Sequence, residues 1–414
     1  MTLYWSRKLQ PSLRRKRLSI AKIRRDVHCL WLLVRLLILQ VLTVAGLVYG
    51  LGLPAQTTPS RQKVVVAYVF PQDRELQAGE IAASKLTRVN YAFANIEGGR
   101  IVDGFKNDDQ NLATLVALKK RNPSLTVLVS VGGWQWSDNF SDMALTKASR
   151  NIFVASVADY IELHQLDGLD VDWEYPGQAG STDHFRPEDR HNFTLLLKEL
   201  RNRFDRRQHK LHRPLYLTIA AGASSSYLAH TDMDKVQRYI DTVNLMAYDY
   251  YEAGGLAGNH APLFTDPADP KKVSADLSVR EFEQAGVPAG KIVLGMPFYG
   301  HQWGNVPDVN HGLFQDGAQL PQGYAPYSVI VATMLNNDFA RYWDLASSVP
   351  YLYSSKQKIF VSYEDTESLI LKSHYVIDQH LAGIMFWDYN GDPTGVLLDV
   401  IDSGLTKDMQ SKSQ

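Results

Sequence analysis

Four acidic residues lie close together in residues 166–176, which read LDGLDVDWEYP. Side chains alternate between the two faces of an extended strand, so three of these acids share one face: Asp170, Asp172 and Glu174. Neighbouring carboxylates repel one another and resist desolvation, which raises the pKa of at least one of them. The pattern therefore predicts a site at which a carboxylic acid delivers a proton.

Eight apolar strands, most of them separated by helices, position these acids. The acid stretch is the fourth strand, and the others are expected at residues 63–70, 86–96, 125–134, 215–221, 242–248, 291–299 and 381–389. Helices are expected at residues 108–121, 149–164, 190–204 and 279–285. This alternation predicts an α/β fold, a closed (β/α)8 TIM barrel. A doubly wound open sheet is the alternative, but polar or aromatic residues end nearly every strand, which suits a barrel mouth.

Catalytic groups in such barrels come from the carboxyl ends of the strands. Glu174 is the last inward position of its strand, Asp172 lies beside it, and Asp170 lies one layer deeper. The alternative is a set of paired carboxylates on the outer surface. It would leave only apolar residues of this strand facing inward and does not explain the neighbouring strands.

The connection between the seventh and eighth strands is unusually long. Residues 300–357 are rich in aromatic side chains, and structureless loops of this length are uncommon. We expect a small α+β insertion with a helix near residues 329–335, forming one wall of the barrel mouth. Its tryptophans, Trp303 and Trp343, are expected mainly to build the core of the insertion.

The N-terminal segment differs in composition from the rest of the chain. Residues 1–53 hold ten Lys or Arg and one acid, and residues 36–53 carry no charge. This pattern predicts export, with residues 1–55 forming either a signal cleaved near Ala55 or a membrane anchor through residues 30–53. A cleaved product would be secreted or periplasmic, whereas an anchored one would keep its catalytic domain outside the cytoplasm. A buried core helix of a cytoplasmic protein is the third possibility. Residues 56–62 are expected to form a linker, and residues 63–405 the barrel.

Several classes of function are disfavoured by composition and motifs. Residues 54–414 carry a net charge of −10, which makes them a poor partner for nucleic acid. The only cysteine is Cys29, and a single cysteine does not indicate whether the protein folds in an oxidising or a reducing compartment. Histidines such as His184, His191 and His260 show no metal-ligand spacing, and no H-E-x-x-H, G-x-S-x-G or P-loop motif occurs. We therefore expect no bound metal.

The segment DGLDVDWE, residues 167–174, resembles the signature of glycoside hydrolase family 18, the chitinases and their relatives. Other strand ends resemble the same family across residues 63–400. They are Tyr68, YAF (91–93), SVGGW (130–134), MAYD (246–249), PFYG (297–300) and FWDYNGD (386–392), together with SYEDTES (362–368) before the eighth strand.

The resemblance implies a retaining chitinase that hydrolyses β-1,4-linked N-acetylglucosamine polymers by substrate-assisted catalysis and needs no cofactor. Glu174 would be the general acid. Asp172 would orient the substrate acetamido group and share a proton with Asp170. Tyr248 would donate a hydrogen bond to the acetamido oxygen.

Further residues gain a role only through this resemblance. Tyr68 and Ser130 would hydrogen-bond Asp170 from below, and Met246 and Asp249 would shape the acetamido subsite. Aromatic faces bind the apolar faces of sugar rings, so the expected sugar-binding aromatics are Phe93, Trp134 and Trp387.

One position departs from the family pattern. Relatives with this insertion often have arginine after PFYG, contacting substrate or Asp249, and here the residue is His301. An imidazole makes a weaker and pH-dependent contact, so substrate binding at this subsite is in doubt.

Two rival functions remain open. One is an endo-β-N-acetylglucosaminidase acting on N-glycans or peptidoglycan-type sugars, and the other is a chitin-binding lectin without activity. Such lectins usually lose the terminal acid of the signature, and Glu174 is present. The expected partner is thus a saccharide containing N-acetylglucosamine, and we expect a monomer.

Overall fold

The computed structural model describes residues 63–411 except residues 78 and 253. The predicted basic segment, the signal or anchor and the linker, residues 1–62, lie outside the described residues. In the part of the chain that is described, no helix is both long enough and apolar enough to cross a membrane.

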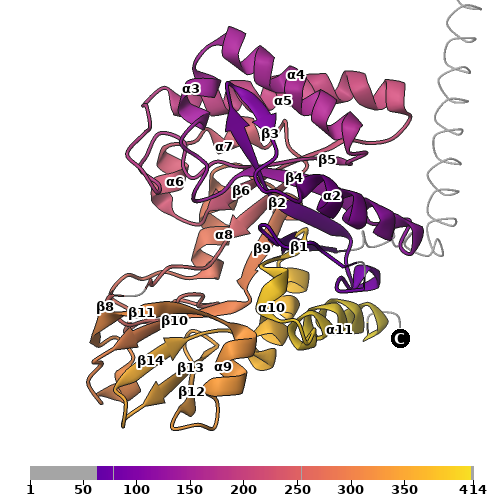
Figure 1. Cartoon of the computed structure of the whole chain (residues 1–414). Coiled ribbons are helices and arrows are strands. Elements are labelled where there is room, and N and C mark those ends of the chain that lie inside the picture. Colours follow the sequence, from indigo (N-terminus) through magenta and orange to yellow (C-terminus); the bar gives the residue numbers. More distant parts are fainter. Residues whose placement is uncertain (1–62, 78, 253, 412–414) are drawn as a thin grey trace, which may run out of the picture. The chain divides into compact units, whose positions relative to one another are not determined.

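Eight parallel strands form a closed barrel (Figure 1). The first strand pairs with both the second and the last, and this double pairing closes the sheet. The structure therefore confirms the TIM barrel and excludes the open sheet. The barrel strands are β1 (Val64–Val69), β2 (Arg88–Glu97), β4 (Thr126–Gly132), β5 (Gly168–Asp172), β6 (Tyr216–Gly222), β7 (Thr242–Met246), β9 (Ile292–Pro297) and β15 (Gly383–Trp387). A short strand, β3 (Arg100–Val102), pairs with the end of β2.

Helices cover the outside of the barrel (Figure 1). Their starts follow local capping chemistry: Thr146 and Ser149 form a reciprocal box at α4, and Asp365 and Ser368 form one at α10. The four expected helices are present. The described helices around the barrel are α2 (Asp108–Ala117), α3 (Phe140–Leu145), α4 (Lys147–Leu163), α5 (Asp189–Leu211), α6 (Ser225–Ala229), α7 (Met233–Val236), α8 (Ala275–Gln284), α10 (Thr366–Asp378) and α11 (Val396–Ser411).

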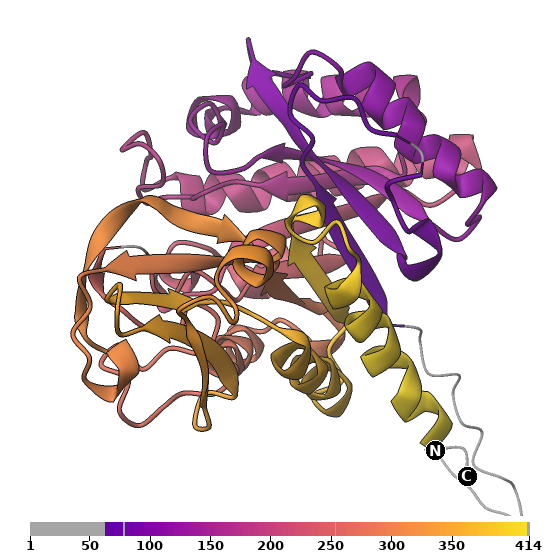
Figure 2. The ribbon, with the colours of Figure 1, turned by 60° about the horizontal axis from the view of Figure 1, so that its bottom comes forward.

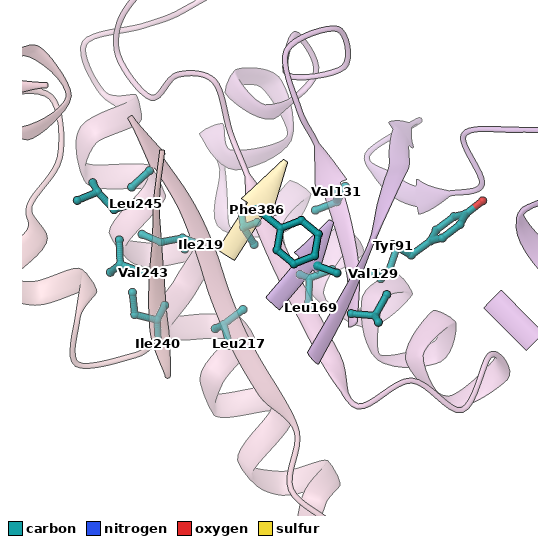
Figure 3. Packing of buried hydrophobic residues seen from close by; sticks show 14 of the residues in the cluster. Tyr91, Val129, Val131, Leu169, Leu217, Ile219, Ile240, Val243, Leu245 and Phe386 are labelled. Atoms are coloured by element: carbon teal, nitrogen blue, oxygen red, sulfur yellow. The ribbon is translucent and has the colours of Figure 1, made fainter. Parts of the chain in front are cut away.

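The main hydrophobic core lies between the strands and the helices (Figure 3). Leu169 and Val171 of β5 are fully buried in it, and the Trp173 ring stacks on Phe140 with 5.1 Å between centroids. Because side chains alternate along a strand, the acids of β5 point into the barrel. The alternative of outward-facing surface carboxylates is thereby excluded.

The connection after β9 folds into the expected α+β insertion (Figure 2). It contains β10 (Tyr299–Gly304), β11 (Asp316–Pro326), α9 (Tyr327–Thr333), β12 (Ala340–Asp344), β13 (Val349–Ser354) and β14 (Ile359–Ser362). Trp303 is fully buried in a hydrophobic core separate from that of the barrel. Trp343 is half-buried, with the Arg341 guanidinium over its ring. The antiparallel sheet has a sixth strand, β8 (Gly255–Leu256), from the loop after β7. Two residues leave no readable pattern, so β8 was not predicted.

Candidate active site

A cavity of about 690 Å³ opens where the barrel strands end. It is large enough for a small ligand and carries both aromatic and acidic side chains. Nine of the residues expected at the site line it: Tyr68, Phe93, Trp134, Asp172, Glu174, Met246, Tyr248, Asp249 and Trp387.

Asp170 lies beneath the cavity and is fully buried. Its carboxylate accepts hydrogen bonds from side chains on four other barrel strands. The hydroxyls of Tyr68 and Ser130 lie 2.8 Å from Oδ2. The Thr218 hydroxyl and the Asn244 side-chain amide both donate to Oδ1. Burial raises the pKa of Asp170, while these hydrogen bonds oppose the rise.

Asp172 has a different environment. It is 4% exposed, and its Oδ1 has no hydrogen-bond partner among the described residues. Burial raises the pKa of Asp172 well above its ordinary value, and the charges of Glu174 and Asp170 add to the rise. The site therefore holds a buried carboxyl oxygen at the cavity that has no hydrogen-bond donor among the described residues.

Glu174 is half-buried at the cavity wall. Its backbone N–H donates to the Ser137 hydroxyl at 2.8 Å, which holds the chain end of β5 in place. Burial raises the pKa of Glu174 to about 7, the nearby charge of Asp249 contributes in the same direction, and the Tyr175 hydroxyl opposes it. A carboxyl with this pKa can act as a general acid near neutral pH.

Aromatic rings line one side of the cavity. Trp387 stacks on Phe93 with 5.5 Å between centroids, and Phe70 packs beside it at 5.4 Å. Trp134 is 51% exposed at the rim, and its ring meets the edge of Tyr175. The peptide bonds after Ala92, Glu174 and Trp387 are cis.

Asp249 carries the densest set of contacts. The Tyr299 hydroxyl lies 2.6 Å from Oδ1 and 2.8 Å from Oδ2, and His301 Nε2 lies 2.8 Å from Oδ1. Burial alone would raise the pKa of Asp249, but His260 and His301 more than offset it, and the pKa lies well below its usual range. Burial also lowers the pKa of His260 to about 4, so this ring is neutral at pH 7. His301 lies behind Asp249 and is outside the set of described residues that line the cavity.

Several residues that line the cavity were given no role on the basis of the sequence. Phe70 directly follows β1 and Tyr175 lies three residues after β5, a position near a strand end that could have found them. Phe105 and Trp136, whose rings pack 4.8 Å apart, come from loops without a recognisable pattern.

The fold is a closed (β/α)8 barrel, and a row of acids points into a cavity lined by aromatic side chains. Together these two features define a glycosidase of the barrel class. Residues 64–392 match Glycosyl hydrolases family 18, and the chain belongs to this family. It is therefore a glycoside hydrolase.

Curated relatives and solved structures agree with this assignment. The chain is 34% identical to "Chitinase A1" of Niallia circulans, covering 80% of this chain and 56% of that protein. It is 32% identical to "Probable chitinase 2" of Drosophila melanogaster, covering 82% and 74%. Among solved structures, a family 18 N-acetylglucosaminidase from Paenibacillus barengoltzii superposes with a TM-score of 0.76 at 41% identity, covering 83% of this chain and 99% of that one.

Proposed function

We propose that this glycoside hydrolase is a retaining chitinase that cleaves β-1,4-linked N-acetylglucosamine polymers by substrate-assisted catalysis. The observation that carries the proposal is the buried Oδ1 of Asp172, which has no partner in the described part of the chain, beside Glu174, whose pKa is raised. A buried acceptor left unsatisfied costs about 1–3 kcal/mol, so a donor from the substrate is expected there. The N–H of a 2-acetamido group provides one.

The reaction follows from this arrangement. Protonated Glu174 donates its proton to the glycosidic oxygen as the bond to the anomeric carbon breaks. The acetamido carbonyl oxygen attacks that carbon and forms a positive oxazolinium, which Asp172 stabilises while accepting the N–H. Glu174, now ionised, takes a proton from water as water attacks the same carbon. The bond from that carbon to the acetamido oxygen breaks, which regenerates the acetamido group, and the two inversions retain the anomeric configuration.

Tyr248 completes the acetamido subsite. Burial raises the pKa of its hydroxyl well above the ordinary value, with Asp249 adding to the rise, so the hydroxyl stays protonated and can donate. We assign it to the acetamido oxygen, which it would hold near the anomeric carbon. Trp387 would form the floor under the reacting sugar and Trp134 a stacking surface at the rim.

The test compares oligomers of N-acetylglucosamine with the same oligomers after deacetylation. Hydrolysis should require the acetyl group, and Glu174→Gln should lower kcat by roughly 10²–10⁴-fold. Glu97→Gln, which changes an exposed Glu at the last position of β2, is the matched control and should behave as wild type. Equal hydrolysis of deacetylated oligomers would rule out substrate assistance, and absence of any hydrolysis with retained binding would favour the lectin.

Asp172→Asn gives an independent check on the role of Asp172. Its kcat should fall more than its substrate affinity, because the oxazolinium charge develops only during the reaction. A loss of affinity alone would contradict the role.

A second candidate is an N-acetylglucosaminidase, favoured by the 41% identity to the Paenibacillus enzyme of that name. The same acids would serve, and the products would differ. Chromatography of early products from a hexamer distinguishes release of single sugars from internal cleavage, and an N-glycan substrate tests the endo-acting rival.

We also propose, from composition alone, that residues 1–55 direct export. A full chain found in the membrane fraction would indicate an anchor, and a processed chain in the medium or periplasm a cleaved signal. An unprocessed chain in the soluble cytosol would contradict both.

A further inference from the structure

Three side chains from separate loops and strands converge behind the cavity wall: Asp249, His260 and His301. Asp249 follows β7, His260 follows β8, and His301 lies on β10. One possible ligand atom from each lies within 4.8 Å of the other two. Asp249 Oδ1 lies 2.8 Å from His301 Nε2 and 3.6 Å from His260 Nδ1. This convergence could not be read from the sequence, where no metal-ligand spacing links these residues.

His260 is the unusual member of the three. Its side chain is fully buried, and neither ring nitrogen has a hydrogen-bond partner among the described residues. Its backbone is held firmly, because its N–H donates to the Ser362 hydroxyl at 2.8 Å and its carbonyl accepts from the Tyr250 N–H. The 3.6 Å separation from Asp249 Oδ1 is too long for a good hydrogen bond. The buried imidazole is thus fixed with one ring nitrogen toward a carboxylate and with no hydrogen-bond partner among the described residues.

The separations suit a shared metal ion. Nitrogen and oxygen ligands lie about 2.0–2.2 Å from Zn²⁺, so two ligands of one tetrahedral ion lie roughly 3–3.5 Å apart. The two measured distances lie just outside this range, 2.8 Å below it and 3.6 Å above it, so small side-chain shifts would bring both ligand pairs into it. Two imidazoles and one carboxylate form a donor set that zinc and other divalent transition metals favour.

The surroundings support this donor set. The Tyr299 hydroxyl donates to Asp249 and would orient its carboxylate, as partners of metal-bound carboxylates do. The charge of Lys372 also acts on His260, but Lys372 is paired with buried Glu364, so the pair adds no net positive charge. The Asp249 side chain is 35% exposed and lines the cavity, which provides a path of entry.

We propose that Asp249, His260 and His301 form a binding site for a divalent transition metal ion, with Zn²⁺ as the first probe. Because Asp249 lines the cavity next to Tyr248, an ion bound behind it would hold the Asp249 carboxylate away from the substrate and inhibit hydrolysis. That last consequence rests on the proposed function, whereas metal binding does not.

The test uses the full chain, purified without a polyhistidine tag and freed of metal with a chelator. Zn²⁺ is titrated against a chromophoric competitor, and Co²⁺ is added separately to read ligand geometry from its visible absorption. Wild type should bind about one ion per chain, with Co²⁺ bands typical of tetrahedral nitrogen and oxygen coordination.

His260→Gln and His301→Arg should each weaken binding by more than about 100-fold, beyond the roughly 10–100-fold typical of changes outside the ligand set. His184→Gln is the matched control, since His184 forms an exposed pair with Asp142 at 3.5 Å, and it should bind as wild type. Circular dichroism establishes that each variant is folded. Cys29 is present in every variant, so any binding there is common to all.

Absence of stoichiometric binding by wild type would overturn the site, as would wild-type affinity in both folded histidine variants. In the hydrolysis assay, Zn²⁺ should slow wild type relative to its metal-free form and leave His301→Arg unaffected by the ion. A preparation that binds Zn²⁺ but hydrolyses no N-acetylglucosamine oligomer would contradict the proposed function and leave the metal site standing.

Discussion

Three acids, two on β5 and Glu174 just after it, have the same chemistry but three different surroundings. Asp170 is held by four side-chain donors, Asp172 has a buried oxygen without a described partner, and Glu174 faces the cavity. Because these environments differ, the three groups need not ionise together. The raised pKa of Glu174 is the feature of this row with the most direct kinetic consequence.

The rate should depend on the protonation of Glu174. Because its pKa is about 7, Glu174 is mostly protonated below pH 7 and mostly ionised above it, where it has no proton to donate. We expect kcat/KM to fall about tenfold per pH unit well above pH 7. Initial rates on N-acetylglucosamine oligomers from pH 5 to 9 measure this. A flat profile up to pH 9 would contradict the assignment.

Ionisation of Glu174 should lower the free energy of unfolding in alkaline solution. The pKa of Glu174 rises from its ordinary 4.5 to about 7 on folding, so the folded state binds this proton more tightly. The resulting stabilisation is complete below pH 4.5 and is lost as the pH rises through 7. Glu174→Gln, which does not titrate, should therefore exceed wild type in unfolding free energy by about 1–3 kcal/mol at pH 8, after allowance for partial exposure.

Urea unfolding of both proteins at pH 4 and pH 8 checks this. The difference between the variant and wild type should be larger at pH 8 than at pH 4. The opposite order would mean that folding lowers the pKa of Glu174.

Lys372 of α10 forms a buried ion pair with Glu364, just before that helix, and a hydrogen bond to the loop before α8. Lys372 and Glu364 are 0% and 1% exposed, and Lys372 Nζ also donates to the carbonyl of Ala261 at 2.6 Å. Burial lowers the pKa of Lys372 and raises that of Glu364, and the pairing opposes both shifts. The contact anchors the residue next to His260.

Breaking this pair on one side should be costly. Lys372→Met leaves Glu364 buried without its partner and should lower the unfolding free energy by about 3–5 kcal/mol. Adding Glu364→Leu should recover a large part of the loss. Lys356→Met, which removes an exposed pair with Asp338, should cost less than about 1 kcal/mol. Urea denaturation of the four proteins measures these values, and equal losses from the buried and exposed lysines would refute the argument.

Closure of the barrel joins strands that are far apart in the chain. Val64 of β1 pairs with Gly383 of β15, and a Cβ at Gly383 would lie 2.0 Å from the Val64 carbonyl oxygen. That oxygen belongs to the backbone of a central strand and cannot move aside cheaply. The seam therefore requires glycine on one side.

Gly383→Ala should destabilise the entire barrel by at least about 1–3 kcal/mol, the usual cost of overpacking. Gly290→Ala is the control, because a Cβ there meets nothing within 4 Å, and its effect should stay within about 0.5 kcal/mol. Thermal and urea unfolding of the two variants measure the difference. Equal stabilities would mean that the strands can separate at the seam without penalty.

Local patterns in the sequence were enough for the elements and for much of the candidate site. The apolar strand rhythm predicted eight strands, and the alternation in 166–176 placed Asp170, Asp172 and Glu174 inside. Aromatic density and length predicted the insertion. These features could be read because burial in a strand or helix repeats with a period of two or about 3.6 residues.

Other features were decided only by the tertiary structure. The donors to Asp170 come from four strands, and β8 joins the insertion sheet from another loop. His260 meets Asp249 and His301 although no spacing connects them. Periodicity reports which side of an element is buried but not which distant element covers it. These contacts exist only because the barrel closes and brings the ends of all its strands to one mouth.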